Sequence, residues 1–204
     1  MIVGVTGGIG AGKSTVCGFF NKRGRVVLST DQIANDVVAS DPSLKEQLSS
    51  SFGQDIYDDL GVLDRPRLAS IVFRDSEKLR KLNSLVHPHV LKILQKKIRN
   101  LPPRQRYPFI VVESALIFEA GLENFFDVVL LVHAPREIRV RRVRKTKGLT
   151  RKEFLARTRT QTPRLDAKRR AHFSISNGGS IKRLKVTVRL LDTLLSTLRQ
   201  SFHK

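Results

Sequence analysis

The residues best suited to chemistry lie near the N-terminus, where a glycine-rich segment ends in a lysine and two hydroxyl residues. Residues 7–15 are Gly-Gly-Ile-Gly-Ala-Gly-Lys-Ser-Thr, which matches the phosphate-binding pattern of glycine, four residues and then Gly-Lys-Ser/Thr. Such a loop lets backbone N–H groups point at a polyphosphate. We expect Lys13 to reach the β- and γ-phosphates and Ser14 to hold Mg²⁺. The expected phosphate-binding residues are Gly8, Ile9, Gly10, Ala11, Gly12, Lys13, Ser14 and Thr15.

The flanks of this loop have the order that the motif needs. The apolar run at 2–5 predicts a short buried strand, and the segment after Lys13, with Val16, Phe19 and Phe20 on one face, predicts a helix that ends at Gly24. A glycine-rich turn that binds nothing is the alternative, but it needs neither flank. Strand, loop and helix together favour a P-loop.

Two carboxylates follow other apolar runs. Residues 25–31 predict a short strand that ends at Asp31, and residues 109–113 predict a buried strand that ends at Glu113. Ligands bind outside the carboxyl ends of parallel strands, so Asp31 would emerge near the loop. P-loop proteins commonly place a carboxylate that holds Mg²⁺ through water where Glu113 stands. Asp31 would serve equally well as the N-cap of a helix that starts around Gln32, so both interpretations stay open.

Residues 41–101 have a helical pattern and no strand of useful length. We predict one helix after Ser76 and another that opens at Pro88, because proline favours the first helical turn and pushes the preceding residue into an extended conformation. His87 would then lie at a helix junction, where a histidine is more often a structural hydrogen-bonding residue than a catalyst. The segment fits an inserted substrate-binding element, although crossover helices are an alternative.

The C-terminal half adds two strands, at 127–132 and, more weakly, at 172–176, and a short helix is predicted around Glu119. After Ser180 an amphipathic helix should pack against the core through the residues Ile181, Leu184, Val188, Leu191, Leu195 and Leu198. A parallel sheet of about five strands flanked by helices follows from this order of elements.

Positive charge is the unusual feature of the composition. The chain has 38 Lys and Arg against 18 Asp and Glu, a net charge of +20, which predicts polyanionic partners, either nucleic acid or phosphorylated small molecules. Residues 136–170 contain fifteen Lys and Arg and three acids. Pro135 should open a helix there, Gly148 should end it, and Thr150 with Glu153 forms a capping box for the next helix.

This basic hairpin has two interpretations. Arg139, Arg141, Arg142 and Arg144 would fold over a bound polyphosphate and supply charge in the transition state, as lids do in phosphoryl-transfer enzymes. A solvated basic face or a nucleic-acid patch is the alternative. With Phe154 as its one aromatic residue, the stretch is poorly supplied with base-stacking platforms, which favours the lid.

Length and composition exclude several classes of protein. At 204 residues, one domain with insertions is expected. No apolar run approaches the roughly 20 residues that span a bilayer, so we expect a cytoplasmic protein without a membrane partner. The single cysteine, Cys17, rules out an internal disulfide and should be a buried thiol in the core. The oligomeric state is not predicted.

Taken together, these motifs resemble the dephospho-coenzyme A kinase family from Ile2 to about Gly179. Residues 6–15 are similar to that family's own P-loop, and residues 31–34 to its second-strand motif. The other similar segments are Arg65 with Leu68 and 71–73, Leu82-Asn83 with His87-Pro88, 116–119, Arg141 or Arg142, Gln161, and 175–178.

The resemblance implies a single P-loop kinase domain, with a core at 1–40, 109–134 and 171–204, a substrate-binding insertion at 41–108 and a lid at 135–170. It implies transfer of the γ-phosphoryl group of ATP, with Mg²⁺, to the 3′-hydroxyl of dephospho-coenzyme A, the last step of coenzyme A synthesis. The implied catalytic residues are Lys13, Asp31, Arg141 and Arg142. Asn177 would join the P-loop in binding ATP, and the implied residues for dephospho-coenzyme A are Asp31, Arg65, His87 and Leu116.

Some positions depart from the family pattern. Ser29 and Glu113 replace family-typical residues, and His172 and Ser176 replace aspartates on the last strand. Another P-loop small-molecule or nucleoside monophosphate kinase would share the loop and lid but should lack Arg65 and the His-Pro pair. A basic nucleic-acid-binding NTPase is the more distant alternative, and the chain has no Asn-Lys-x-Asp motif for guanine.

Overall fold

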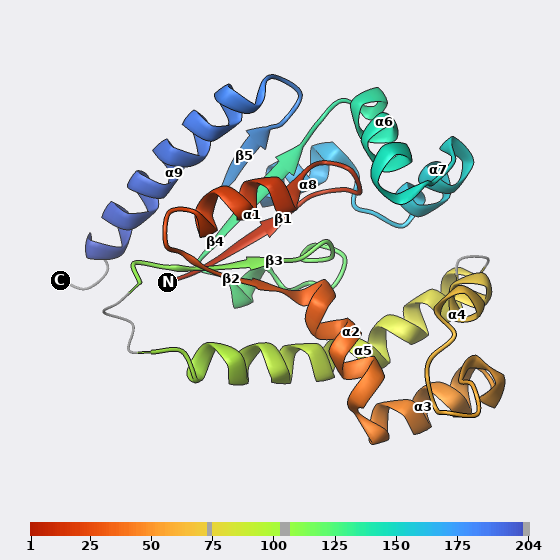
Figure 1. Cartoon of the computed structure of the whole chain (residues 1–204). Helices are drawn as coiled ribbons and strands as arrows, with labels where there is room; N and C mark the ends of the chain where they lie inside the picture. The colour runs from red at the N-terminus through yellow and green to blue at the C-terminus, as the bar shows by residue number, and fades with distance from the viewer. Residues whose placement is uncertain (73–74, 103–106, 202–204) are drawn as a thin grey trace. The chain divides into compact units, whose positions relative to one another are not determined.

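The computed structural model describes residues 1–72, 75–102 and 107–201 (Figure 1). Phe73, which belongs to one of the motifs above, lies outside the described residues. The chain forms two compact units: unit 1 comprises residues 1–29 and 102–204, and unit 2 comprises residues 30–101. Unit 2 starts before the insertion expected at 41–108, because the helix at 30–40 packs against the long helix of that unit.

Unit 1 contains a five-stranded parallel sheet in the order β2-β3-β1-β4-β5, which confirms the predicted fold class. Its strands are β1 (Ile2–Thr6), β2 (Val26–Ser29), β3 (Ile110–Glu113), β4 (Val128–His133) and β5 (Phe173–Ser176). Val5 pairs with Glu113 on one side and with Leu130 on the other. The central strands have no polar side chain before their last residues, because both faces of the sheet are covered.

Helices of unit 1 flank the sheet and connect its last strands (Figure 1). Helix α1 (Lys13–Asn21) follows β1, and α9 (Ile181–Ser201) packs against α1 and β5. Between β4 and β5 lie α6 (Arg136–Lys147), α7 (Arg151–Arg159) and α8 (Arg164–Arg170). Gly148 ends α6 in a left-handed conformation, and the capping box of Thr150 and Glu153 starts α7, both as predicted.

A buried carboxylate ties α9 to the turn after α1. Asp192 is 1% exposed and accepts hydrogen bonds from Arg23 Nε at 2.7 Å and from Arg25 Nε at 2.7 Å. Arg25 also donates to Ser196 and lies over the ring of Phe109, 4.9 Å from its centroid. Two guanidinium groups therefore compensate the charge that α9 brings into the interior.

Unit 2 is helical, as predicted. It contains α2 (Thr30–Ser40), α3 (Pro42–Phe52), the 3-10 turn η1 (Gln54–Ile56), α4 (Arg65–Val72) and α5 (Ser76–Arg99). Helix α5 is the centre of this unit, since α2, α3 and α4 all pack against it. In the described part of unit 2, the only β structure is an isolated bridge between Tyr57 and Leu63.

Two predicted elements are wrong. Helix α5 runs through Pro88 without a break, and its N-cap is Asp75 rather than Ser76. Pro88 has no N–H for the carbonyl of Ser84, but the packing of α5 against three helices outweighs that loss. The short helix predicted around Glu119 is a set of hydrogen-bonded turns, which Gly121 ends at φ 63°. A 3-10 turn, η3 (Glu123–Phe125), follows.

Candidate active site

The loop between β1 and α1 leaves the start of α1 open to a ligand. Its N-cap is Gly12, in a left-handed conformation at φ 92°, and no side chain caps the helix. The N–H groups of the first turn and the helix dipole are therefore available to an anion. Lys13 Nζ donates a hydrogen bond to the carbonyl of Gly7 at 2.9 Å, and Ser14 and Thr15 are exposed.

Arg139 of α6 contacts this loop directly. Its Nε donates to the carbonyl of Ile9 at 2.8 Å, and its guanidinium lies over the buried ring of Phe154, 5.2 Å from the centroid. A Cβ on Gly8 would lie 2.5 Å from Arg139 Nη2, so only glycine admits the arginine at this distance. Burial, and secondarily the charge of Arg136, lowers the pKa of Arg139, which remains a cation.

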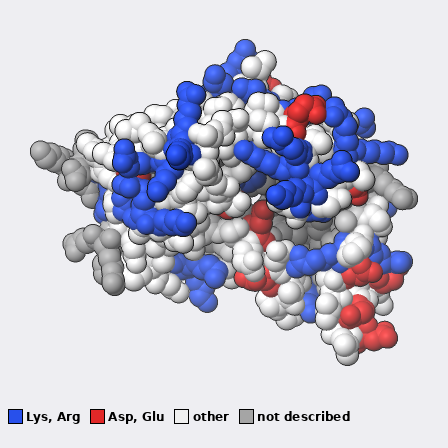
Figure 2. Space-filling model, turned by 45° about the horizontal axis from the view of Figure 1, so that its top comes forward, with Lys and Arg blue, Asp and Glu red and all other residues white. Residues whose placement is uncertain are grey.

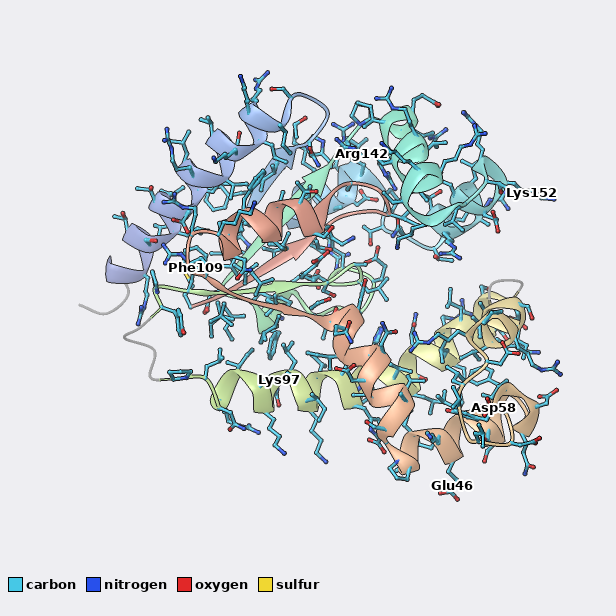
Figure 3. The ribbon with its side chains drawn as sticks, in the orientation of Figure 1. Glu46, Asp58, Lys97, Phe109, Arg142 and Lys152 are labelled. Carbon is cyan, nitrogen blue, oxygen red and sulfur yellow. The ribbon has the colours of Figure 1, made fainter. Side chains whose placement is uncertain are left out.

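Two further side chains brace the loop. Gln161 Oε1 accepts a hydrogen bond from the N–H of Ile9 at 3.1 Å. Asn177, 5% exposed, donates from Nδ2 to the carbonyl of Ala11 at 2.8 Å, and its Oδ1 accepts from Arg142 at 3.4 Å. Arg142, labelled in Figure 3, lies on α6. Its Nη1 also donates to the carbonyl of Ala11 at 3.5 Å.

The structure separates the lid arginines that the sequence treats together. Arg139 and Arg142 reach the P-loop, whereas Arg141 is exposed and makes no hydrogen bond with any described residue. Arg139 was one of the four lid arginines expected from the sequence, but it was not among the catalytic residues that the resemblance implied. Its spacing was the available signal, because residues three apart on a helix share a face and Arg142 is three residues further on.

A pocket of about 260 Å³ lies beside the loop in unit 1. Its lining includes Gly8, Arg139, Gln161, Glu119 and His133. The Nδ1 atom of His133 is buried without a hydrogen-bond partner among the described residues. Burial lowers the pKa of His133, and the nearby charges of Arg164 and Lys168 add to that effect. With backbone N–H groups and cations in its wall, the pocket suits a phosphorylated ligand.

The candidate residues of unit 2 lie on different helices. Asp31 is the second residue of α2, exposed, and its carboxylate accepts no hydrogen bond from the described residues. The N-cap interpretation of Asp31 is therefore wrong, since α2 already starts at Thr30. Arg65, at the start of α4, donates to Asn35 of α2.

The histidines of α5 differ from the prediction. His87 is half-buried inside the helix rather than at a junction, and burial lowers its pKa. His89, which the sequence did not single out, lies 2.7 Å from Asp41 (Nδ1 to Oδ2) and so joins α5 to the N-cap of α3. A pair so distant in sequence has no local pattern.

The remaining candidates lie at the end of β3 and under the loop. Glu113 is the last residue of β3, and the backbone of the half-buried Leu116 is hydrogen-bonded to Ser114 Oγ at 3.4 Å. Cys17 is 2% exposed, as predicted for a core thiol. Burial, and then the adjacent Glu113, raises the pKa of Cys17 far above its ordinary value, so the sulfur stays a thiol.

An uncapped P-loop on a parallel sheet of order 2-3-1-4-5, covered by a helix with two arginines on the loop, defines a P-loop kinase. Residues 1–183 match the family model described as dephospho-CoA kinase. The chain therefore belongs to the dephospho-CoA kinase family.

Individual relatives agree with that assignment. A dephospho-CoA kinase from Moorella thermoacetica is 35% identical over 188 residues, which cover 92% of this chain and 89% of the relative. A crystal structure from Thermus thermophilus is 38% identical with a TM-score of 0.79 and covers 97% of both chains. The solved dephospho-CoA kinase from Campylobacter jejuni is 25% identical with a TM-score of 0.70 and covers 96% of this chain and 97% of its own.

Proposed function

We propose that this kinase transfers the γ-phosphoryl group of ATP to the 3′-hydroxyl of dephospho-coenzyme A and so completes coenzyme A. The observation that supports this most strongly is the uncapped P-loop in a chain whose family match extends over residues 1–183. Such a transfer needs little covalent chemistry from the protein, so positioning and charge stabilisation dominate.

The triphosphate would bind to the N–H groups at the start of α1, with Lys13 leaving the carbonyl of Gly7 for the β- and γ-phosphates. Mg²⁺ is held in kinases by few protein ligands, substrate phosphates and water. That fits this site, because Ser14 offers an exposed hydroxyl and no group of three or more His, Cys, Asp or Glu that could hold a metal forms among the described residues. When bound, Mg²⁺ would neutralise charge on the transferring phosphates.

Helices α6, α7 and α8 would form the lid, as the segment 135–170 was expected to do. We assign the phosphate contact to Arg139 and the support of the nucleotide side to Arg142 with Asn177. The hydrogen bond of Arg139 to Ile9 holds its guanidinium beside Gly8, at the wall of the pocket. A cation fixed at this distance would stabilise the charge of the transition state without a large rearrangement.

Unit 2 would be the substrate-binding insertion. Asp31 would accept or orient the attacking hydroxyl, which needs an accessible carboxylate such as this one. Arg65 and His87 would contact dephospho-coenzyme A, and Leu116 of unit 1 would line the acceptor side. Arg65 is held in place by Asn35, and the low pKa of His87 keeps it uncharged near pH 7.

The proposal is tested by comparing acceptors. ADP release with dephospho-coenzyme A is measured beside adenosine, the nucleoside monophosphates and shikimate, at a fixed concentration of ATP. We expect kcat/KM for dephospho-coenzyme A to exceed that for every other acceptor by at least about 10²-fold. A higher kcat/KM for a nucleoside monophosphate would instead assign the chain to a different kinase reaction.

A further inference from the structure

Helix α9 has exposed apolar side chains on the side that faces away from the sheet. Its inner side packs through Leu184, Val188 and Leu195, and α1 and β5 lie only on that side (Figure 1). The apolar residues exposed on α9 are Ile181 (59%), Val186 (47%), Leu190 (64%) and Leu194 (43%). The expectation that Ile181 packs against the core is therefore wrong, because the first turn of α9 leaves this side chain in solvent.

The outer face of α9, as we call it, consists of two adjacent rows with a spacing of four residues, one helical turn. The first row is Lys182, Val186, Leu190 and Leu194, and the second is Lys185, Arg189, Thr193 and Thr197, all of them exposed. The N-terminal half of this face is therefore cationic and the C-terminal half is apolar. Membrane-surface helices combine these two features.

The hydroxyl groups of this face are already hydrogen-bonded within the helix. Thr193 Oγ1 donates to the carbonyl of Arg189 at 3.2 Å, and Thr197 Oγ1 donates to the carbonyl of Thr193 at 3.2 Å. Both threonines therefore offer their methyl groups outward. Removing water from the apolar half leaves no hydroxyl without a partner, so the usual cost of burying polar groups is small here.

Acidic residues do not balance the cations of this face. Unit 1 contains 27 Lys and Arg but eight Asp and Glu, whereas unit 2 contains eleven and ten. On α9 the one acid in the described residues is Asp192, which is buried against Arg23 and Arg25. On the face of unit 1 that Figure 2 shows, Lys and Arg side chains accordingly outnumber Asp and Glu.

These observations select among the possible partners. A second copy of the chain would place cations against cations. Nucleic acid would satisfy the cations but leave the leucines in water, and no described aromatic residue lies on the outer face to stack on bases. An anionic bilayer offers phosphates to the cations and acyl chains to the leucines.

We propose that the outer face of α9 docks on the surface of an anionic lipid bilayer, with Leu190 and Leu194 in the interface and Lys182, Lys185 and Arg189 on headgroup phosphates. None of the helices in the described residues is long and apolar enough to cross a membrane, so the contact is peripheral. The expectation of no membrane partner came from the lack of spanning and targeting segments, which does not address contact with a membrane surface. The proposal is independent of the kinase reaction.

Insertion is measured with a single fluorescent probe. The sequence has no tryptophan, so Leu190→Trp gives one signal, and Leu165→Trp on α8, where the leucine is 71% exposed, is the matched control. We expect emission of Leu190→Trp to shift to the blue, and brominated acyl chains to quench it, with vesicles of phosphatidylcholine and phosphatidylglycerol. Unchanged emission at 190, or equal shifts at both positions, overturns the proposal.

Charge dependence is measured by vesicle sedimentation of the full chain. Lys185→Glu with Arg189→Glu should weaken binding by more than about 25-fold at low salt, because each cation lost costs about fivefold and the reversal of its charge adds to that loss. Lys96→Glu with Lys97→Glu on α5 makes the same change of net charge on exposed residues of unit 2 and should leave binding near that of the wild type.

An equal loss of vesicle binding in both double variants would mean that the net charge of the protein, and not the outer face of α9, causes the binding. That result would contradict the proposal. A blue shift of Leu190→Trp that appears without vesicles and grows with protein concentration would mean that dimers bury this position, and it would also contradict the proposal. ADP release should be unchanged in the two variants of α9, which belongs to neither the lid nor the insertion, and this separates a failure of docking from a failure of the proposed function.

Discussion

At the scale of single residues, Asp31 tests whether the acceptor is activated by a carboxylate. Asp31→Asn should lower kcat by roughly 10²-fold or more, because the amide cannot accept the proton, and should change ATP affinity little. Steady-state kinetics together with ATP titration separate the two effects. Since Asp31 lies inside α2 and caps nothing, its replacement should leave the unfolding transition in place. Near-normal kcat would remove Asp31 from the mechanism.

The lid arginines give a second prediction at this scale. Arg139→Ala and Arg142→Ala should each lower kcat/KM by about 10²-fold, because each removes a cation held on the P-loop. Arg141→Ala is the matched control on the same helix, and its exposed side chain should be dispensable. A larger loss in Arg141→Ala than in Arg139→Ala would contradict this assignment and favour Arg141, one of the two arginines that the resemblance implies.

At the scale of elements, the attachment of α9 depends on one carboxylate. Asp192→Ala leaves Arg23 and Arg25 without their shared partner, and we expect the unfolding free energy to fall by about 3 kcal/mol. This is the lower end of the usual range, because Arg23 can reach water. In urea denaturation, Asp166→Ala, which removes an exposed pair with Arg169 at 4.0 Å, should cost below about 1 kcal/mol. Equal costs would contradict a buried ion pair.

Helix α5 should make stability sensitive to mild acid. Burial lowers the pKa of His87 below its ordinary 6.5, so below about pH 6.5 the unfolded chain binds a proton that the folded chain does not. The unfolding free energy therefore decreases as the pH is lowered from about 6.5, and it stops decreasing once the pH is below the pKa of His87 in the folded state. His87→Gln should flatten this loss between about pH 7 and 5 in urea titrations. The other histidines are common to both proteins, so an unchanged slope would show that His87 does not cause it.

The elements also show how far the sequence predicts the structure. Apolar runs such as 109–113 and 127–132 predicted strands correctly, because a buried parallel strand is apolar on both faces. The break at Pro88 was wrong because a local rule ignores the three helices that hold α5. The pairing of His89 with Asp41, and that of Asp192 with two arginines, joins residues far apart in sequence, so no local spacing predicts them.

For the candidate site, the division is similar. The P-loop could be predicted to the residue, since its order of glycines, lysine and hydroxyl is local. The choice of Arg139 and Arg142 over Arg141 could not, because it depends on which face of α6 meets the loop and on the ring of Phe154 beneath Arg139. Gln161 accepts its hydrogen bond from Ile9 of the P-loop only when α7 packs against α6, so this contact has no local signal in the sequence.

At the scale of the whole molecule, the net charge is almost entirely in unit 1. This unit contains 27 of the 38 Lys and Arg and eight of the 18 acids. ATP and dephospho-coenzyme A are both polyanions, so an electropositive core unit favours their encounter and lowers their local repulsion. Different residues supply the positive charge at the P-loop, in the lid and on the outer face of α9.

The central claim is transfer of phosphate from ATP to one particular hydroxyl. The most direct test locates the new phosphate by ³¹P–¹H correlation NMR after incubation with ATP and dephospho-coenzyme A, beside Lys13→Ala as the inactive control. We predict a 3′-phosphomonoester formed in equal amount with ADP, and a rate at least about 10²-fold lower for Lys13→Ala. Phosphate on another hydroxyl, or ADP formed with free inorganic phosphate and no ester, would contradict the account.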